Sequence, residues 1–171
     1  MYIAKGILND SDIKNLYNQL MNEPKWKIGG SPDPIYDFPR FTALDSEGIY
    51  DPFLSGYFIS TIGKIRDKIY DDYGFNIPNQ LEAIRFNAQK KGNIPSFHSD
   101  FDHKGAFSWS VVGFITPHWD KSWGGELQVQ DKTFVFEPGD FIVFKSSDFH
   151  DALPIKVDTP FWRVSVACMI R

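Results

Sequence analysis

Residues 124–144 read GGELQVQDKTFVFEPGDFIVF, and this stretch decides the fold class. It contains three short apolar segments with alternating or continuous hydrophobic residues: Glu126–Gln130, Thr133–Phe136 and Phe141–Phe144. Turn-forming residues separate them, namely Asp131-Lys132 and Pro138-Gly139-Asp140. Short strands that follow one another at this spacing are typical of antiparallel β-sandwiches and barrels.

The same pattern extends over the second half of the chain. Further short strands are predicted at Leu81–Ala88, around Phe97–Phe101, at Phe107–Ile115, near His150 and at Trp162–Ile170. Gly92-Asn93 and Gly124-Gly125 supply additional turns. The sequence therefore predicts a mainly β (α+β) fold, either a β-sandwich or a jelly roll.

Two helices are predicted before these strands. The first has one apolar face at helical spacing, with Asp10 or Ser11 as its cap and Pro24 as its stop; the face consists of Ile13, Leu16, Tyr17, Leu20 and Met21. The second begins at Asp51-Pro52 and ends at Gly74. We expect one domain, residues 1–171, in which 1–80 give helical support and a lid loop and 81–171 form the jelly-roll core.

The stretch Gly29–Tyr50, which joins the two helices, is rich in Gly and Pro. A loop this long in a compact domain is often a lid over a functional site. The alternative is a surface excursion that packs on the sheet. Together with Asp102–Ala106 and Thr116–Ser122, this stretch is expected to determine substrate specificity.

Composition excludes several classes of protein. The net charge of −4 argues against a protein that binds duplex nucleic acid, which normally shows a basic face. The single cysteine, Cys168, rules out an internal disulfide and a cysteine zinc site. No segment approaches the ~20 apolar residues of a membrane span, and the N-terminus lacks the apolar run of a signal peptide. A cytoplasmic location is expected, and no feature assigns an oligomeric state.

His98-Ser99-Asp100 is the candidate metal-binding pair. Side chains two apart on a strand point to the same side, so one imidazole and one carboxylate can meet at one ion. Non-haem Fe(II) oxygenases use two His and one carboxylate, with three positions left open. His150 is the candidate for the second histidine. A His-x-Asp pair is weak evidence alone; its weight comes from the Gly-Gly-Glu-Leu turn, the Pro-Gly-Asp turn, the later His and the final Arg-x-Ser, which follow in order.

Arg163 and Ser165 share one face of the last strand. If that face looks into the barrel, Arg163 is a buried cation that needs an anion, and its planar guanidinium fits a carboxylate. The alternatives are that Arg163 faces solvent or pairs with an internal acid such as Glu126 or Asp140.

These residues resemble the Fe(II)/2-oxoglutarate-dependent dioxygenases, and among them the prolyl 4-hydroxylase-like group. The resemblance covers roughly Leu81 to Ile170 and rests on Gly92, His98, Asp100, Gly124-Gly125-Glu126-Leu127, Pro138-Gly139-Asp140, Phe144, His150, Arg163 and Ser165. It implies a double-stranded β-helix (jelly roll) with N-terminal bracing helices. It also implies iron ligands His98, Asp100 and His150, and a clamp of Arg163 and Ser165 on the distal carboxylate of 2-oxoglutarate.

The reaction implied by the resemblance uses Fe(II), 2-oxoglutarate and O2 to hydroxylate an unactivated C–H bond, with release of succinate and CO2. The substrate would be a peptidyl, prolyl-type residue or an amino acid. Where relatives often carry a Tyr that contacts the co-substrate, this chain has Gln89, whose amide can still donate a hydrogen bond, and Phe114 replaces another Tyr.

Several other residues are candidates for lesser roles. His118, Trp109, Trp119 and Trp123 are candidates for the pocket wall or for core packing, and Asp151 could orient His150. His103 is expected in a surface loop and Cys168 in the core. Competing functions are an oxidative demethylase of a nucleobase, a non-catalytic jelly-roll binding module, and a cupin-like metal isomerase or hydrolase.

Overall fold

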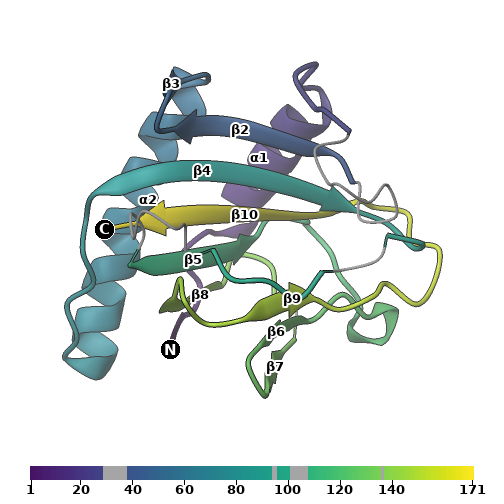
Figure 1. The fold of residues 1–171 in the computed structure, drawn as a ribbon. Coiled ribbons are helices and arrows are strands. Elements are labelled where there is room, and N and C mark those ends of the chain that lie inside the picture. The colour runs from purple at the N-terminus through teal and green to yellow at the C-terminus, as the bar shows by residue number, and fades with distance from the viewer. Residues whose placement is uncertain (29–37, 94–95, 101–107, 136) are drawn as a thin grey trace.

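The computed structural model describes residues 1–28, 38–93, 96–100, 108–135 and 137–171. Two antiparallel sheets and two helices form the fold (Figure 1). The large sheet has seven strands in the order β1 (Tyr2–Ala4), β8 (Phe141–Lys145), β5 (Trp109–Phe114), β10 (Arg163–Ile170), β4 (Leu81–Gln89), β2 (Arg40–Asp45) and β3 (Gly48–Ile49). The small sheet has the order β7 (Lys132–Phe134), β6 (Leu127–Val129) and β9 (His150–Ala152). This arrangement is a jelly roll and confirms the predicted fold class.

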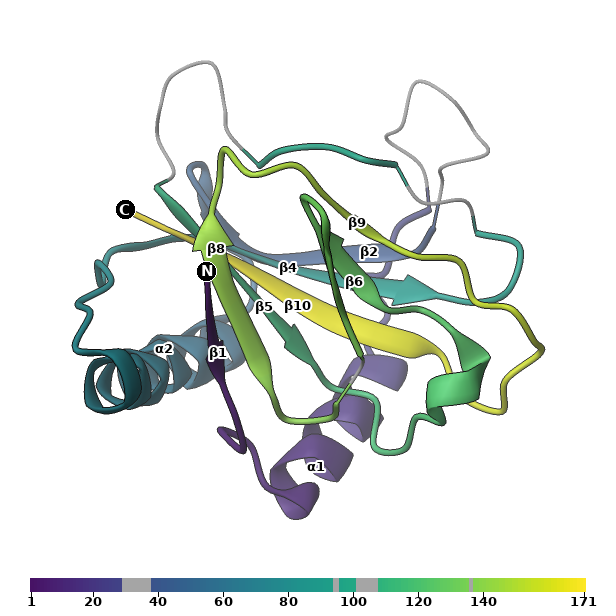
Figure 2. The ribbon, with the colours of Figure 1, turned by 90° about the horizontal axis from the view of Figure 1, so that it is seen from below.

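Successive side chains of the large sheet point to opposite faces and so contribute to two separate apolar layers. One face of the large sheet packs against helices α1 (Asp10–Met21) and α2 (Pro52–Tyr73), and the opposite face packs against the small sheet (Figure 2). On β10 the residues facing the helices are Val164, Val166, Cys168 and Ile170, all fully buried. Arg163 and Ser165, at the alternate positions, therefore face the small sheet.

The helix ends follow local capping chemistry. In α2, the Asp51 side chain accepts a hydrogen bond from Leu54 N, Pro52 occupies the first turn, and Gly74 is left-handed with φ 65°, all as predicted. In α1 the predicted cap was wrong. Asn9, and not Asp10 or Ser11, caps this helix by accepting from Asp12 N, because the helix begins one residue earlier than the apolar pattern shows.

Three strands arise from the first part of the chain, where none was predicted. β2 and β3 lie within the predicted loop Gly29–Tyr50, so that prediction was wrong for the described residues 38–50; residues 29–37 lie outside the described part. Phe41 and Ala43 are buried against the helices, which makes β2 an ordinary sheet strand beside β4. β1 pairs with β8, and the turn at Pro138-Gly139-Asp140 holds its far end through Gly6 N, which donates to Asp140 Oδ1 at 2.8 Å. The division into a helical first half and a β second half is therefore incomplete.

The predicted strand around Phe97–Phe101 is absent from its described residues. His98 forms only an isolated antiparallel bridge with His150.

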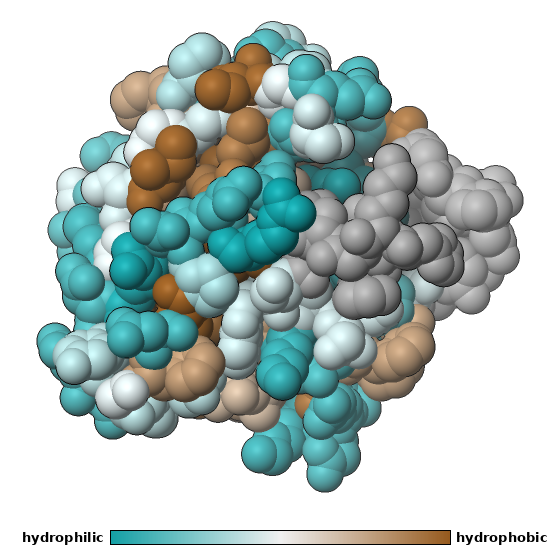
Figure 3. All heavy atoms as spheres, turned by 60° about the vertical axis from the view of Figure 1, so that its left-hand side comes forward, coloured by the Kyte–Doolittle hydropathy of each residue, from teal (hydrophilic) through white to brown (hydrophobic). Residues whose placement is uncertain are grey.

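The outer side of α2, turned forward in Figure 3, is mostly hydrophilic, with hydrophobic residues in separate groups. No helix in the described part of the chain is long and apolar enough to cross a membrane.

Candidate metal centre

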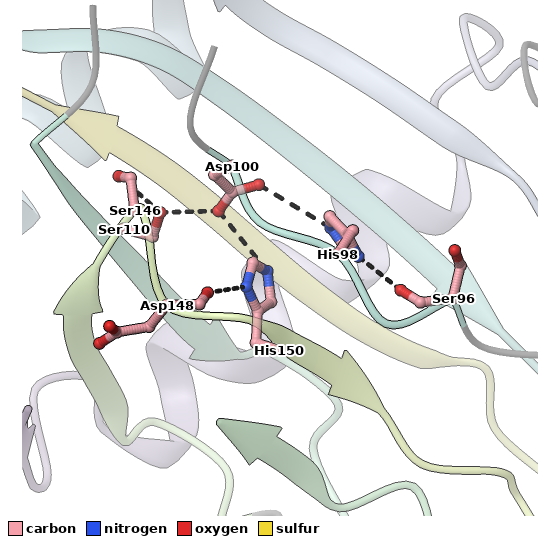
Figure 4. Close-up of polar contacts among 7 residues, drawn as sticks. All are labelled: Ser96, His98, Asp100, Ser110, Ser146, Asp148 and His150. Carbon is pink, nitrogen blue, oxygen red and sulfur yellow. Dashed lines mark hydrogen bonds and ion pairs between the residues drawn. The ribbon is translucent and has the colours of Figure 1, made fainter. Parts of the chain in front are cut away.

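His98, Asp100 and His150 meet at one point between the two sheets (Figure 4). Backbone pairing brings the histidines together: His98 N donates to His150 O at 3.0 Å, and His150 N donates to His98 O at 2.7 Å. Each of the three residues offers a ligand atom within 4.8 Å of the others. A non-catalytic module with an incidental motif was expected to hold the histidines far apart, and the structure shows the opposite.

The hydrogen bonds of the two imidazoles fix which ring nitrogen faces the centre. His98 Nδ1 lies 2.6 Å from Ser96 O, and His150 Nδ1 lies 3.2 Å from Asp148 O. A carbonyl oxygen only accepts, so each Nδ1 carries the proton and each Nε2 presents its lone pair. The Nε2 atoms lie 3.9 Å and 3.6 Å from the Asp100 carboxylate oxygens. Asp151, the predicted orienting partner of His150, is thus replaced by the backbone carbonyl of Asp148.

The electrostatic environment of His150 also favours metal binding. His150 is buried, and burial lowers its pKa, while Asp100 raises it and His98 lowers it. The direction is downward, so the imidazole is neutral at pH 7 and can act as a ligand. Two neutral imidazole nitrogens and one carboxylate are the donor set of the non-haem Fe(II) facial site, and the residues present fit that ion.

A pair of buried serines holds the Asp100 carboxylate. Ser110 Oγ, on β5, donates to Asp100 Oδ2 at 2.6 Å and lies 3.0 Å from Ser146 Oγ (Figure 4). Because the single Ser110 hydroxyl proton is used on Asp100, Ser146 must donate to Ser110. Both serines are 0% exposed. One carboxylate oxygen is thereby occupied, which favours metal binding through the other oxygen alone and leaves more positions open.

We expect Ser110→Ala to weaken Fe(II) binding by about 10- to 100-fold, the usual effect of losing an outer-shell partner. Ser146→Ala should have a smaller effect, because Ser110 keeps its direct bond to Asp100. Fe(II) affinity is measured by anaerobic titration. Ser55→Ala is the matched control, since Ser55 is an equally buried serine that donates to Ala43 O on the helix side of the sheet. Equal affinities for Ser110→Ala and Ser55→Ala would contradict the prediction.

Arg163 lies deeper between the sheets and is 1% exposed. Its Nε donates to Gly125 O at 2.7 Å, its Nη1 donates to Gln89 Oε1 at 2.6 Å, and its guanidinium lies over the Phe114 ring at 5.6 Å. Burial lowers its pKa to about 10, while the negative fields of Asp151 and Glu126 raise it. The group remains a cation at pH 7. Arg163 therefore does not face solvent. Of the two acids considered as its partners, Asp140 accepts a hydrogen bond from Gly6 N, and Glu126 acts on Arg163 through its negative field.

The Gly124-Gly125 turn of the sequence motif lies directly against Arg163. Gly125 has φ 77°, and a Cβ atom at this position would lie 2.9 Å from Arg163 Cδ. Only glycine combines this backbone conformation with such a close approach. The turn therefore lets the Gly125 carbonyl reach the guanidinium.

Gln89 has a role that the sequence did not reveal. It was predicted to donate a hydrogen bond to the co-substrate, but its Oε1 accepts from Arg163, its register partner on β10. The residue is buried, at 7% exposed. Gln89 therefore orients the guanidinium, and a contact between its amide nitrogen and the co-substrate remains a prediction.

Gln89→Glu keeps the shape of the side chain but places a negative charge against Arg163. We expect the affinity for 2-oxoglutarate to fall by about 10- to 100-fold, because the new carboxylate competes for the cation. Gln89→Met, of similar length and uncharged, should cause a smaller loss. The measurement is anaerobic titration of the Fe(II) form with 2-oxoglutarate, followed by its visible charge-transfer band. Equal losses in both variants would mean that charge at this position is irrelevant.

The other predicted residues divide between site and core. Ser165 is buried at 6% exposed, on the same strand face as Arg163. Trp109 packs with Tyr2 and Phe75, away from the centre. Trp119 is buried between the sheets and donates to Gly124 O, while exposed His118 contacts Trp123 and Phe161. Cys168 is in the core, where burial raises the pKa of its thiol. His103 and the segment Asp102–Ala106 lie outside the described residues.

Comparisons with known proteins agree with this arrangement. Residues 84–171, half of the chain, match the family model described as the 2OG-Fe(II) oxygenase superfamily. A comparison with curated proteins gives no match. Three solved structures of similar fold are informative. A prolyl-4-hydroxylase from Pseudomonas putida is 17% identical with a TM-score of 0.67, covering 99% of this chain and 91% of that chain.

The second is a prolyl hydroxylase from Trichoplax adhaerens in complex with a peptide of the oxygen degradation domain of hypoxia inducible factor. It is 13% identical with a TM-score of 0.71, covering 99% and 82% of the two chains. The third, the epimerase SnoN in complex with Fe3+, alpha ketoglutarate and nogalamycin RO, is 11% identical with a TM-score of 0.68, covering 98% and 77%. At these identities the structures show a shared fold. Because the family model matches the half of the chain that contains the metal centre and Arg163, the protein belongs to the 2OG-Fe(II) oxygenase superfamily and is a dioxygenase that uses Fe(II), 2-oxoglutarate and O2.

Proposed function

We propose that the protein hydroxylates an unactivated C–H bond of a peptidyl, prolyl-type residue or of an amino acid. His98, Asp100 and His150 hold the iron in this proposal, and Arg163 with Ser165 holds the distal carboxylate of 2-oxoglutarate. The observation that carries it is the convergence of two imidazoles and one carboxylate, whose ligand atoms lie within 4.8 Å of one another. The buried guanidinium of Arg163 on the same face supports the second part.

When bound together, Fe(II), 2-oxoglutarate and O2 supply the oxidising power, and the co-substrate leaves as succinate and CO2. The residues of the chain orient the groups that would hold the iron and the co-substrate. The Ser146–Ser110 pair fixes Asp100, the backbone carbonyls of Ser96 and Asp148 fix the two imidazoles, and Gln89 with Gly125 aims Arg163. These contacts hold each group in one orientation, which is how a preorganised site favours its ligands.

The choice of substrate class rests on the prolyl hydroxylases of similar fold, one of which carries a peptide. The net charge of −4 continues to argue against duplex nucleic acid as the substrate. We further propose that residues 1–171 act as one domain, since β1, β2 and β3 complete the large sheet that carries the site. A cytoplasmic location remains a prediction.

The test supplies the protein with Fe(II), 2-oxoglutarate and O2 and measures succinate, with and without proline-containing peptides and free proline. Mass spectrometry of the substrate should show the gain of one oxygen atom. A product of unchanged mass would indicate epimerisation, the activity named for the SnoN neighbour. Absence of succinate under all conditions, together with no charge-transfer band in the anaerobic titration, would contradict the proposal.

A further inference from the structure

The face of the large sheet that carries Arg163 bears two more arginines. On β4 and β2 the residues facing the helices are Ile84, Phe86, Phe41 and their alternate neighbours. Arg85 and Asn87 on β4, and Arg40 and Thr42 on β2, therefore lie on the opposite face. We call these four residues the arginine floor. The strand register aligns Arg40 with Asn87 and Ser165, and aligns Thr42 with Arg85 and Ala167.

The arginine floor and the metal centre lie at similar positions along the length of β10. Along β10, Arg163 marks the co-substrate end, and Met169 pairs with Ser110, which holds Asp100. Ala167 lies between these two positions, and Arg85 is its register partner on β4, one strand or about 5 Å away. A ligand that lies against the metal centre from the β4 side would therefore meet the arginine floor.

This part of the sheet is open, although β4 lies between β10 and β2. Arg85 is exposed and Ala167 is half-buried, whereas Ile84 and Phe86 on the helix side are 0% exposed. The small sheet, which pairs through β7, β6 and β9, packs on residues of β5 and β8 and on Ala167 of β10. Among the described residues, no strand covers the β4 and β2 side. Within the described part of the chain, the exposed side chain of Arg85 is therefore available to a ligand.

The charged side chains that β4, β5 and β10 themselves present on this face are arginines, whereas the nearby carboxylates of Asp100, Glu126 and Asp151 come from other segments and lie at Ser110 and Arg163. Up to the register shift that follows Thr42 in β2, the described inward positions of β2, β4, β5 and β10 carry three arginines and no carboxylate: Arg40, Thr42, Ala83, Arg85, Asn87, Gln89, Ser110, Val112, Phe114, Arg163, Ser165, Ala167 and Met169. Asp45, which lies beyond this shift, accepts hydrogen bonds from Glu47 N and the Tyr50 hydroxyl. Elsewhere in the described chain, cations do meet acids, as Lys25 meets Asp51, Lys121 meets Glu137 and Arg171 meets Glu82. Arg40 instead stacks on the Phe38 ring at 4.5 Å, and no described acid lies within ion-pair distance of Arg40 or Arg85. In a chain of net charge −4, two neighbouring arginines without a described acidic partner indicate an anionic ligand.

We propose that Arg40 and Arg85 form a subsite for a carboxylate of the substrate, separate from the co-substrate carboxylate at Arg163. This inference rests on the proposed function. Residues diagonal across two antiparallel strands lie about 7–8 Å apart, within reach of long side chains, so both guanidiniums can approach one carboxylate. Guanidinium groups bind carboxylates bidentately, and Asn87 and Thr42 supply further hydrogen-bond donors between them. The carboxylate is an acidic side chain beside the hydroxylated residue of a peptide, or the main-chain carboxylate of a free amino acid.

The experiment compares matched probes by equilibrium binding without O2, so that turnover is not required. The peptide pair has capped ends and one proline flanked by either Glu or Gln; the small-molecule pair is proline and prolinamide. The wild-type protein with Fe(II) and 2-oxoglutarate should bind the acidic member of one pair about tenfold more tightly. The peptide pair and the proline pair distinguish the two sources of the carboxylate.

Charge reversal provides the decisive variants. Arg85→Glu and Arg40→Glu should each abolish the preference, and the double variant should favour a Lys-flanked peptide. Lys64→Glu is the matched control, because it makes the same charge change at an exposed position of α2, on the other side of the large sheet. Its preference should equal that of the wild type. Thermal unfolding of each variant identifies any that fail to fold, in which case Arg85→Gln and Arg40→Gln replace them and should lose the preference without inverting it.

Two results would overturn the subsite. One is a wild-type protein that shows no preference within either pair, including no binding of any probe. The other is a preference that survives in both charge-reversal variants as it does in Lys64→Glu. Failure of the proposed function gives a different result, namely no succinate from the wild type with O2, whatever the binding preference.

Discussion

Asp100→Asn should lower the affinity for Fe(II) by about a thousandfold, which corresponds to about 4 kcal/mol. The Asp100 carboxylate is the one negative ligand in the cluster of His98, Asp100 and His150, and an amide of the same shape removes its charge. The Ser110 hydroxyl can still donate to the amide oxygen, so the local structure is retained. Fe(II) affinity is measured by anaerobic titration, and succinate formation should fall below detection.

Asp148→Asn is the matched control for this variant. It removes the same charge two residues before His150, but the Asp148 side chain accepts from Gln130 Nε2 and only its backbone carbonyl contacts the His150 ring. Its Fe(II) affinity should stay within a few-fold of the wild type. If Asp100→Asn and Asp148→Asn bound Fe(II) equally well, Asp100 would not be a ligand and the metal site would have to be placed elsewhere.

Arg163→Gln should raise the Kd for 2-oxoglutarate by about 100- to 1,000-fold while leaving Fe(II) affinity largely unchanged. Removing one partner of a buried, hydrogen-bonded charge pair costs about 2–5 kcal/mol in binding. The Nε2 atom of a glutamine occupies the place of the arginine Nε, so it can still donate to the Gly125 carbonyl, although it does not extend to Gln89. The loss therefore chiefly reflects the missing cation. The charge-transfer band of the anaerobic complex reports the Kd directly.

Arg171→Gln serves as the control for Arg163→Gln. It removes a guanidinium just after the other end of the same strand, where Arg171 is exposed and pairs with Glu82 at 3.3 Å. The Kd for 2-oxoglutarate should not change. Loss of Fe(II) binding with an unchanged Kd for 2-oxoglutarate in Arg163→Gln would reverse the roles assigned to the two halves of the site.

The features predicted correctly from the sequence have local causes. Asp51, Pro52 and Gly74 mark the ends of α2 because capping and backbone conformation act within one helical turn. The strands from β4 to β10 are visible because apolar alternation and turn residues are local patterns. Histidine, aspartate and arginine stand out as candidate site residues because their chemistry is unusual in a core, and their order along the chain makes the pattern specific.

Tertiary structure alone decided the rest. β1 and β2 are short, ordinary sequences that become strands because β8 and β4 offer free edges, a contact between residues far apart in the chain. The hydrogen bond of Ser110 to Asp100 and the turn of Gln89 toward Arg163 depend on strand register, which no pattern in a single strand encodes. Thus the sequence determined which groups are the candidates for the chemistry, whereas sheet pairing determined which neighbours orient them and placed Arg40 and Arg85 together on one face.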